Sequence, residues 1–310
     1  MTNKKFSLKK VLVIIIAALI VFCAISMAAT KFIYDSIFTR YDAPIEIPYE
    51  CSYLIDARET KTYPSGDVLL KAHLYRADEE ISKNALIVLA PGFNAGADSY
   101  ITQIASLLKE GWSVFAFDPT GCKASGGENS VGFAQEVLDL EATLKYVENC
   151  GRFGYNDIVL LGHSRGGYAA CLMLERDFDI SAVVSISGVN SSMAAVIGSA
   201  EDKIGPLAYL NYGFLWGYQS LIFGAETISL QADEVIDSCD TPVLILHGKN
   251  DTEVPSDKYS IYSYKDEIEN PNADFLLIDG GHTDLLFAEN GGANARAMSK
   301  IDEFLSLSLS

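Results

Sequence analysis

The sequence predicts an α/β fold built on a mostly parallel sheet of eight strands, with helices on both faces. Short apolar runs typical of buried strands alternate with longer stretches of helical periodicity, and this alternation is typical of parallel sheets. The chain has 310 residues, which is enough for one large domain with additional segments. Its hydrophobic content of 49% argues against disorder.

The N-terminal region contains a candidate membrane anchor. The segment from Val11 to Ala29 is uncharged, and as a helix it would be about 28 Å long, close to the thickness of the bilayer hydrocarbon core. Because basic residues precede it, the positive-inside rule predicts a cytoplasmic N-terminus and an extracytoplasmic domain after Thr30. These basic residues are Lys4, Lys5, Lys9 and Lys10. The alternative is a signal peptide cleaved after Ser26-Met27-Ala28, which would release a secreted domain.

We therefore expect three parts. Residues 1–30 form a cytoplasmic tail and a transmembrane signal anchor, residues 31–48 form a linker, and residues 49–310 form the α/β domain. Residues 1–40 hold six of the 23 basic and one of the 41 acidic residues, so the rest has 17 basic and 40 acidic residues. Such an acidic domain repels nucleic acid, which we exclude as a partner.

The six cysteines do not predict a particular set of disulfide bonds. Five lie beyond the apolar segment, an odd number without a Cys-x-x-Cys motif, so the sequence does not choose a disulfide. With only four histidines in the chain, no zinc-ligand cluster is visible.

The strands and helices of the domain follow in order. We expect an antiparallel strand over Val68–Arg76, with Tyr49–Arg58 as its partner. The helices predicted after it end at Glu110, span Val131–Asn149, follow Ser164, and lie within Glu289–Ser310. The remaining strands are apolar runs: Ala85–Ala90, Ser113–Phe117, Ile158–Leu161, Ile180–Ser187, Val243–His247 and Ala273–Ile278.

A stretch from about Gly188 to Asp240 interrupts this rhythm and is predicted to be an inserted helical cap. It is too long for a simple connection between two strands, and it is rich in aromatic residues: Tyr209, Tyr212, Phe214, Trp216, Tyr218 and Phe223. These rings either pack the cap onto the domain or form an apolar wall above a site for an acyl substrate.

One motif concentrates the chemistry. Gly162-His163-Ser164-Arg165-Gly166 fits the pattern Gly-x-Ser-x-Gly between a strand and a helix. A tight turn there would lift the side chain of Ser164 off the sheet, and the glycines would leave room for the neighbouring strand and helix. Ser164 would then lie at a helix N-terminus, which favours developing negative charge.

A serine nucleophile needs a base, and the base needs an orienting carboxylate. With this turn, the acid and then the base follow the serine along the chain. His282 follows the last predicted strand and is our candidate base, and Asp251 follows the preceding strand and is our candidate acid. The competing carboxylates are Glu253 and Asp284.

Three further groups complete the predicted site. His247 is expected to hold the turn that presents Asp251. The backbone N–H groups of Arg165 and Phe93 are the candidate donors to an oxyanion.

With these residues in hand, the chain from about Tyr49 onward resembles the α/β-hydrolase superfamily. It looks most similar to a membrane-anchored bacterial branch akin to serine aminopeptidase-like and monoacylglycerol-lipase-like hydrolases. The resemblance rests on five motifs in order: Pro91-Gly92-Phe93, Asp118…Gly121…Ser125-Gly126, Gly162-His-Ser-Arg-Gly166, His247-Gly…Asp251…Val254-Pro255 and Gly281-His282.

The resemblance implies an α/β-hydrolase fold and a Ser164/Asp251/His282 triad that needs no metal or cofactor. We expect hydrolysis of a small, apolar carboxylic ester through an acyl-enzyme, with amidase, aminopeptidase-type or thioester chemistry as alternatives on the same triad. From a different class, the chain could be a catalytically silent binding protein tethered to the membrane.

Overall fold

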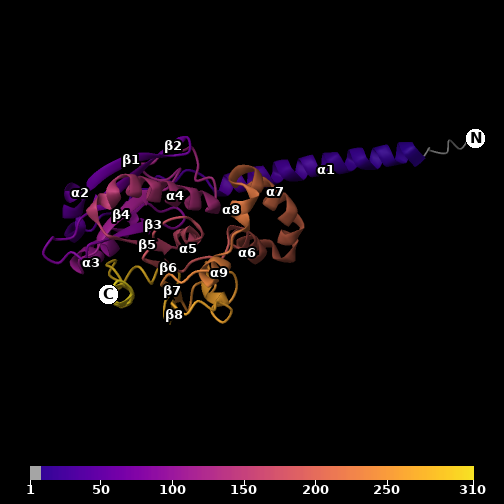
Figure 1. Ribbon diagram of the computed structural model, residues 1–310. Coiled ribbons are helices and arrows are strands. Elements are labelled where there is room, and N and C mark those ends of the chain that lie inside the picture. The colour runs from indigo at the N-terminus through magenta and orange to yellow at the C-terminus, as the bar shows by residue number, and fades with distance from the viewer. Residues whose placement is uncertain (1–7) are drawn as a thin grey trace, which may run out of the picture.

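The computed structural model describes residues 8–310, apart from the side chains at positions 8, 199, 202, 203 and 204. The predicted cytoplasmic tail with Lys4 and Lys5 lies outside the described residues. The first element is the long helix α1 (Leu8–Ile37), which extends from the rest of the molecule as a single rod (Figure 1). Its length and composition suffice to cross a membrane.

The sheet has eight strands in the order β1-β2-β4-β3-β5-β6-β7-β8. The pairs β1/β2 and β2/β4 are antiparallel and the others are parallel, which confirms the predicted mostly parallel sheet. The strands are β1 (Glu59–Ser65), β2 (Val68–Tyr75), β3 (Ala85–Ala90), β4 (Ser113–Asp118), β5 (Asp157–His163), β6 (Ala182–Ile186), β7 (Val243–Gly248) and β8 (Ala273–Ile278).

One strand prediction is wrong. The partner of β2 is β1, whereas residues 49–57 form the short helices η1 (Tyr49–Cys51) and α2 (Tyr53–Ala57). Residues 59–65 were missed because they hold few apolar residues and include Pro64, and a proline is tolerated on an edge strand such as this one.

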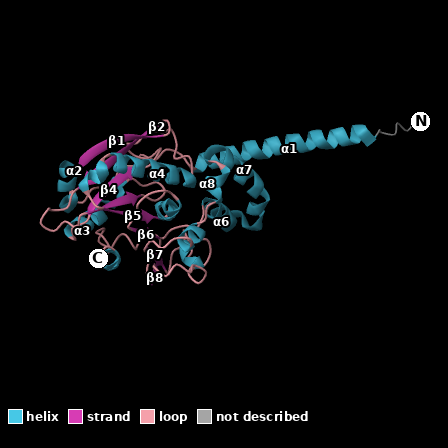
Figure 2. Ribbon diagram, in the orientation of Figure 1, coloured by secondary structure: helices cyan, strands magenta, loops and turns pink. Residues whose placement is uncertain are grey.

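Helices cover both faces of the sheet, as predicted (Figure 2). On one face α4 (Phe133–Asn149), α5 (Arg165–Leu172) and α9 (Ala232–Asp237) contribute buried side chains to one core cluster. On the other face α2, α3 (Ile101–Lys109) and α10 (Ala295–Ser308) contribute to a second. In α4 one apolar face is buried, with Val137, Leu140 and Val147 fully enclosed.

Between β6 and β7 the chain forms a run of helices, where the sequence predicts the cap. They are α6 (Ser192–Ile204), η5 (Gly205–Asn211), α7 (Tyr212–Phe223) and α8 (Ala225–Ser229), followed by α9. α7 lies against α1 near the place where α1 meets the rest of the molecule (Figure 1).

The end of α1 packs on the domain. The helix continues past Ala29 to Ile37, so the first part of the expected 31–48 linker is helical. Tyr34 and Phe38 are each only 2% exposed and pack with residues of α6 and α7. Burial of these aromatic side chains explains why the helix persists beyond its uncharged part.

Candidate active site

The turn at Ser164 has the geometry of a nucleophile elbow. β5 ends at His163 and α5 begins at Arg165, so Ser164 alone joins them, with φ of 54° and ψ of −117°. A positive φ is strained for a residue with a side chain. A Cβ at Gly162 would lie 2.1 Å from the carbonyl oxygen of Gly166, so a glycine is required there, as the sequence predicts.

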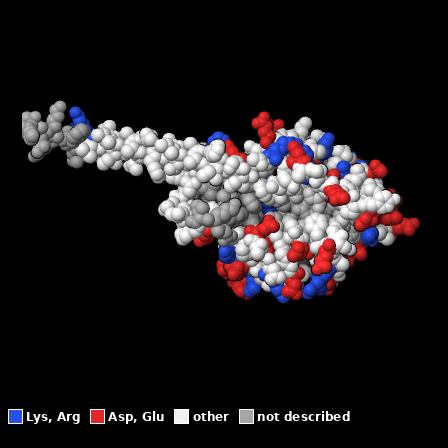
Figure 3. Space-filling model, turned by 180° about the vertical axis from the view of Figure 1, so that it is seen from behind, with Lys and Arg blue, Asp and Glu red and all other residues white. Residues whose placement is uncertain are grey.

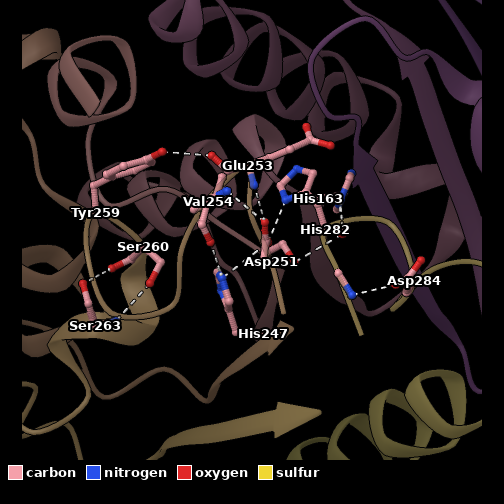
Figure 4. Close-up of polar contacts among 12 residues, drawn as sticks. His163, His247, Asp251, Glu253, Val254, Tyr259, Ser260, Ser263, His282 and Asp284 are labelled. Atoms are coloured by element: carbon pink, nitrogen blue, oxygen red, sulfur yellow. Dashed lines mark hydrogen bonds and ion pairs between the residues drawn. The ribbon is translucent and has the colours of Figure 1, made fainter. Parts of the chain in front are cut away.

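The candidate acid and base are in direct contact (Figure 4). Asp251 follows β7, His282 follows β8, and Nδ1 of His282 lies 2.8 Å from Oδ2 of Asp251. Since a carboxylate accepts, Nδ1 carries the proton and Nε2 of a neutral His282 keeps its lone pair. This is the tautomer that a general base requires.

Asp251 is held as a charged acceptor. Its Oδ1 accepts hydrogen bonds from the backbone N–H groups of Glu253, at 3.0 Å, and Val254, at 2.8 Å. Burial alone would raise the pKa of Asp251, but the hydrogen bonds from His282 and Val254 outweigh it and lower the pKa. His247 holds the same turn from beneath, since its Nε2 lies 2.8 Å from the carbonyl oxygen of Val254.

The two competing carboxylates have other surroundings. Glu253 is exposed, and Asp284 accepts a hydrogen bond from the N–H of Gly281 at 2.7 Å, which caps the loop before His282. Neither side chain is hydrogen-bonded to the His282 ring among the residues that the structure describes.

A chain of hydrogen bonds ties the base loop to the elbow. Nε2 of His163 lies 3.2 Å from the carbonyl oxygen of His282, and its Nδ1 lies 3.1 Å from the hydroxyl of Tyr100. That hydroxyl also accepts from the N–H of Gly92 at 2.8 Å. A carbonyl only accepts, so Nε2 of His163 is the donor and Tyr100 donates to Nδ1.

This chain fixes the residue before Ser164 to the backbone of the base. The rings of His163 and His282 have centroids 4.9 Å apart, and burial lowers the pKa of His163 to about 3, which keeps it neutral. The Ser164 hydroxyl itself makes no hydrogen bond to the ring of His282 within residues 8–310. Catalytic hydrogen bonds are often long before substrate binds.

The two candidate oxyanion donors lie on neighbouring segments. The guanidinium of Arg165 lies over the ring of Phe93, 5.7 Å from its centroid. The backbone N–H groups of both residues donate to no group in the part of the chain that the structure describes. Free N–H groups beside a nucleophile are what an oxyanion site needs.

Sequence reasoning missed the role of the Arg165 side chain. It is fully buried, and its Nη2 lies 2.8 Å from Oε2 of Glu136 on α4, which is also buried. Burial raises the pKa of Glu136, although Arg165 opposes the rise. The pair supports the turn and the ring of Phe93 from below.

Tyr100 and His163 were also missed as positioning residues. The available signal was the occurrence of a histidine inside the motif itself, but its partners come from elements that only the fold brings together.

All six cysteines are free in the structure, and no group of three or more potential metal ligands occurs within the described residues.

Comparisons with known proteins agree with the observed fold. A sequence model described as the alpha/beta hydrolase fold matches residues 85–208. A structure of the Pyrococcus furiosus esterase Pf2001 is 20% identical with a TM-score of 0.64, covering 88% of this chain and 100% of its own. Est1E from Butyrivibrio proteoclasticus with bound ferulic acid is 17% identical with a TM-score of 0.57, covering 80% of this chain and 99% of its own.

A third similar structure is the alpha/beta hydrolase GrgF from Penicillium sp. sh18. It is 16% identical with a TM-score of 0.60, covering 81% of this chain and 99% of its own. No curated protein matches the chain. The sheet order and the elbow define an α/β protein with a serine at a strand-to-helix turn. The chain therefore has the α/β-hydrolase fold, and residues 85–208 match the family model of that fold.

Proposed function

We propose that the protein is a serine hydrolase that cleaves carboxylic esters through an acyl-enzyme intermediate. The observation that carries the proposal is the buried Asp251–His282 pair, with its 2.8 Å contact, on a loop bonded to the elbow residue His163. One of the similar structures, Pf2001, is named as an esterase, so esters are the first substrates to test.

In the proposed mechanism, Nε2 of His282 takes the proton of the Ser164 hydroxyl as its oxygen bonds to the carbonyl carbon. The N–H groups of Phe93 and Arg165 stabilise the oxyanion. The ester C–O bond then breaks and the alcohol leaves with the proton from His282. Water, deprotonated by the same ring, attacks the acyl carbon, the bond to Oγ of Ser164 breaks as His282 returns the proton to Oγ, and the acid leaves.

A fluorophosphonate probe tests this mechanism. The probe should label the protein, and Ser164→Ala should abolish both labelling and hydrolysis of p-nitrophenyl esters. Asp251→Asn should keep the protein folded but lower kcat by roughly 10⁴-fold, as the wrong tautomer does in such triads. Persistent labelling of Ser164→Ala would refute the proposal.

A substrate panel separates the alternatives on the same triad. Matched ester, thioester and aminoacyl amide substrates should give the highest kcat/KM for the ester. A folded wild-type protein that neither reacts with the probe nor hydrolyses any of the three would instead support the silent binding protein.

We further propose that α1 is an uncleaved single-pass anchor with the domain on the extracytoplasmic side. Its apolar side chains, such as Leu12, Ile20 and Ile25, are more than half exposed, while Tyr34 and Phe38 tie its end to the domain. A membrane-impermeant maleimide should label the exposed Cys150 in intact spheroplasts. Cys150→Ser is the control for the other cysteines, and labelling only after lysis would contradict this topology.

A further inference from the structure

The cap packs against the apolar part of α1 as well as against its end. The rings of Phe22 and Phe214 meet edge to face with centroids 6.1 Å apart. A Cβ at Gly217 would lie 3.5 Å from the Cε of Met27. Phe22 precedes Ala29 by seven residues, which is about 10 Å along a helix. The start of α7 therefore lies beside a part of α1 that the proposed anchor places inside the bilayer.

This part of the cap carries no charge. From Gly205 to Ala225 the chain has 21 residues without Asp, Glu, Lys or Arg, in a domain that is otherwise strongly acidic. In Figure 3 the charged side chains gather over the α/β domain, whereas α1 is white along most of its length. Large side chains of η5 and α7 are exposed: Leu207, Tyr209, Leu210, Tyr212, Trp216 and Leu221.

Such a surface fits the boundary of a membrane. An exposed apolar patch is unusual on a soluble monomer, and Trp and Tyr are enriched where a membrane meets water. Leu210 and Leu221 are 78% and 79% exposed. Burial of such side chains in lipid would remove the unfavourable contact of their apolar surface with water.

The apolar side chains continue from this surface to the candidate site. Tyr34 of α1 and Phe38, which directly follows α1, pack with Tyr218 of α7 in one cluster, and the ring of Phe93 packs against that cluster. The centroids of Phe38 and Phe93 are 5.5 Å apart. Phe93 is the residue whose N–H we propose as an oxyanion donor, so the apolar cluster reaches the reaction centre.

We propose that residues 205–225 (the membrane surface of the cap) lie in the outer leaflet beside α1, and that the enzyme takes acyl esters directly from that leaflet. The substrate half of this proposal rests on the proposed function. The occupant is the bilayer and not a second protein, because α1 itself fixes this surface next to the membrane. The ester carbonyl would then reach Ser164 with its acyl chain along Phe38 and Phe93.

The chain's own tryptophans allow a direct test of membrane contact. It has two, Trp216 in the membrane surface and Trp112, which is 1% exposed in the α/β domain. The full-length protein in phosphatidylcholine vesicles should lose Trp216 fluorescence when the lipids carry bromine on their acyl chains. Trp216→Phe leaves Trp112 as the reference, which should not be quenched.

If the emission that disappears in Trp216→Phe is not quenched by brominated lipid, the membrane contact is refuted. If Trp216 is shielded from water but is not quenched, and the protein is a dimer in detergent, the surface contacts a second copy of the chain. That result would also overturn the proposal.

Measurements of hydrolysis test whether the enzyme takes its substrate from the leaflet. The double variant Leu210→Glu/Leu221→Glu should lose at least about tenfold of its activity on a long-chain p-nitrophenyl ester embedded in vesicles, since charged side chains disfavour the interface. Its activity on soluble p-nitrophenyl acetate should stay at the wild-type level. The matched control is Leu307→Glu, which changes an equally exposed leucine, 72%, on α10.

The outcomes distinguish failure of uptake from the leaflet from failure of the proposed ester hydrolysis. Unchanged activity on the embedded ester, or an equal loss on both esters, would refute uptake from the leaflet. A wild-type protein that hydrolyses neither ester would refute the proposed function, and the quenching experiment would still decide the membrane contact.

Discussion

Within residues 8–310, the buried guanidinium of Arg165 has one carboxyl partner, Glu136, at 2.8 Å. Removal of one partner from a buried ion pair leaves a charge without compensation and costs about 3–5 kcal/mol. We expect Glu136→Leu to lower the free energy of unfolding by about this amount, measured by urea denaturation in detergent. The double variant Glu136→Leu/Arg165→Met should be more stable than Glu136→Leu alone, and a double variant that is less stable would contradict the pairing.

Tyr100 tests the hydrogen-bond chain between the elbow and the base. Tyr100→Phe removes the hydroxyl that joins Gly92 to His163, so the loop of His282 loses part of its support. Because small displacements of catalytic groups are costly, kcat should fall by about tenfold or more while KM changes little. Tyr75→Phe is the matched control, since that buried hydroxyl bonds only to Arg58 among the described residues.

An equal fall of kcat in both tyrosine variants would show a general effect of losing a buried hydroxyl. An unchanged kcat in Tyr100→Phe would show that the base is held without this chain.

For single residues, the sequence predicts the contacts that follow from chain order and misses the contacts that depend on packing. Ser164, Asp251 and His282 could be named because each follows a strand and their order matches the elbow. The partners of His163 and of the Arg165 side chain could not be named. Tyr100 and Glu136 lie on helices whose orientation toward the elbow is set only when the core forms.

Among the elements, α1 shows most clearly what a hydropathy pattern leaves out. The uncharged run ends at Ala29, but the helix continues because Tyr34 and Phe38 are buried against the cap. Loss of a large buried aromatic side chain costs about 3–5 kcal/mol. We therefore expect Phe38→Ala to destabilise the domain by this amount in urea denaturation, whereas a free linker there would tolerate it.

Phe32, which lies on α1, provides the control. Its side chain is 77% exposed, so Phe32→Ala should change the free energy of unfolding by less than about 0.5 kcal/mol. Equal effects of the two substitutions would show that α1 does not pack on the domain as described.

The other elements could be predicted where the local sequence determines them and could not where tertiary contacts do. The strands β3 to β7 were predictable because central strands of a parallel sheet are buried on both faces and are continuous apolar runs. The edge strand β1 was not, because it holds few apolar residues and its pairing with β2 is determined by tertiary structure.

For the whole molecule, the strand order explains why distant residues meet. β5, β6, β7 and β8 are consecutive neighbours and parallel, so the loops with Ser164, Asp251 and His282 leave the same edge of the sheet. Ligand sites of α/β sheets form at this edge. The sequence predicted the layers and this edge, whereas the docking of the cap on α1 depends on contacts between side chains far apart in the chain.

The stability of the whole molecule should fall as the pH falls below neutrality, because three buried histidines outnumber the buried carboxyl of Glu136, whose raised pKa acts in the opposite direction. Burial lowers the pKa of His163 to about 3 and that of His73 to about 4, and it also lowers the pKa of His247. In the unfolded chain a histidine has a pKa near 6.5. Between these values the unfolded chain binds protons that the folded protein does not.

The contribution of these histidines is therefore complete above pH 6.5 and is lost progressively as the pH falls, by up to about 1.4 kcal/mol per pH unit for each histidine. His73→Gln should reduce this slope, since His73 lies in β2 away from the candidate site. The free energy of unfolding, measured in urea between pH 7 and pH 5, tests this. The carboxyl of Asp251, whose pKa is lowered, titrates below that window, so an unchanged slope in His73→Gln would mean that His73 titrates alike in both states.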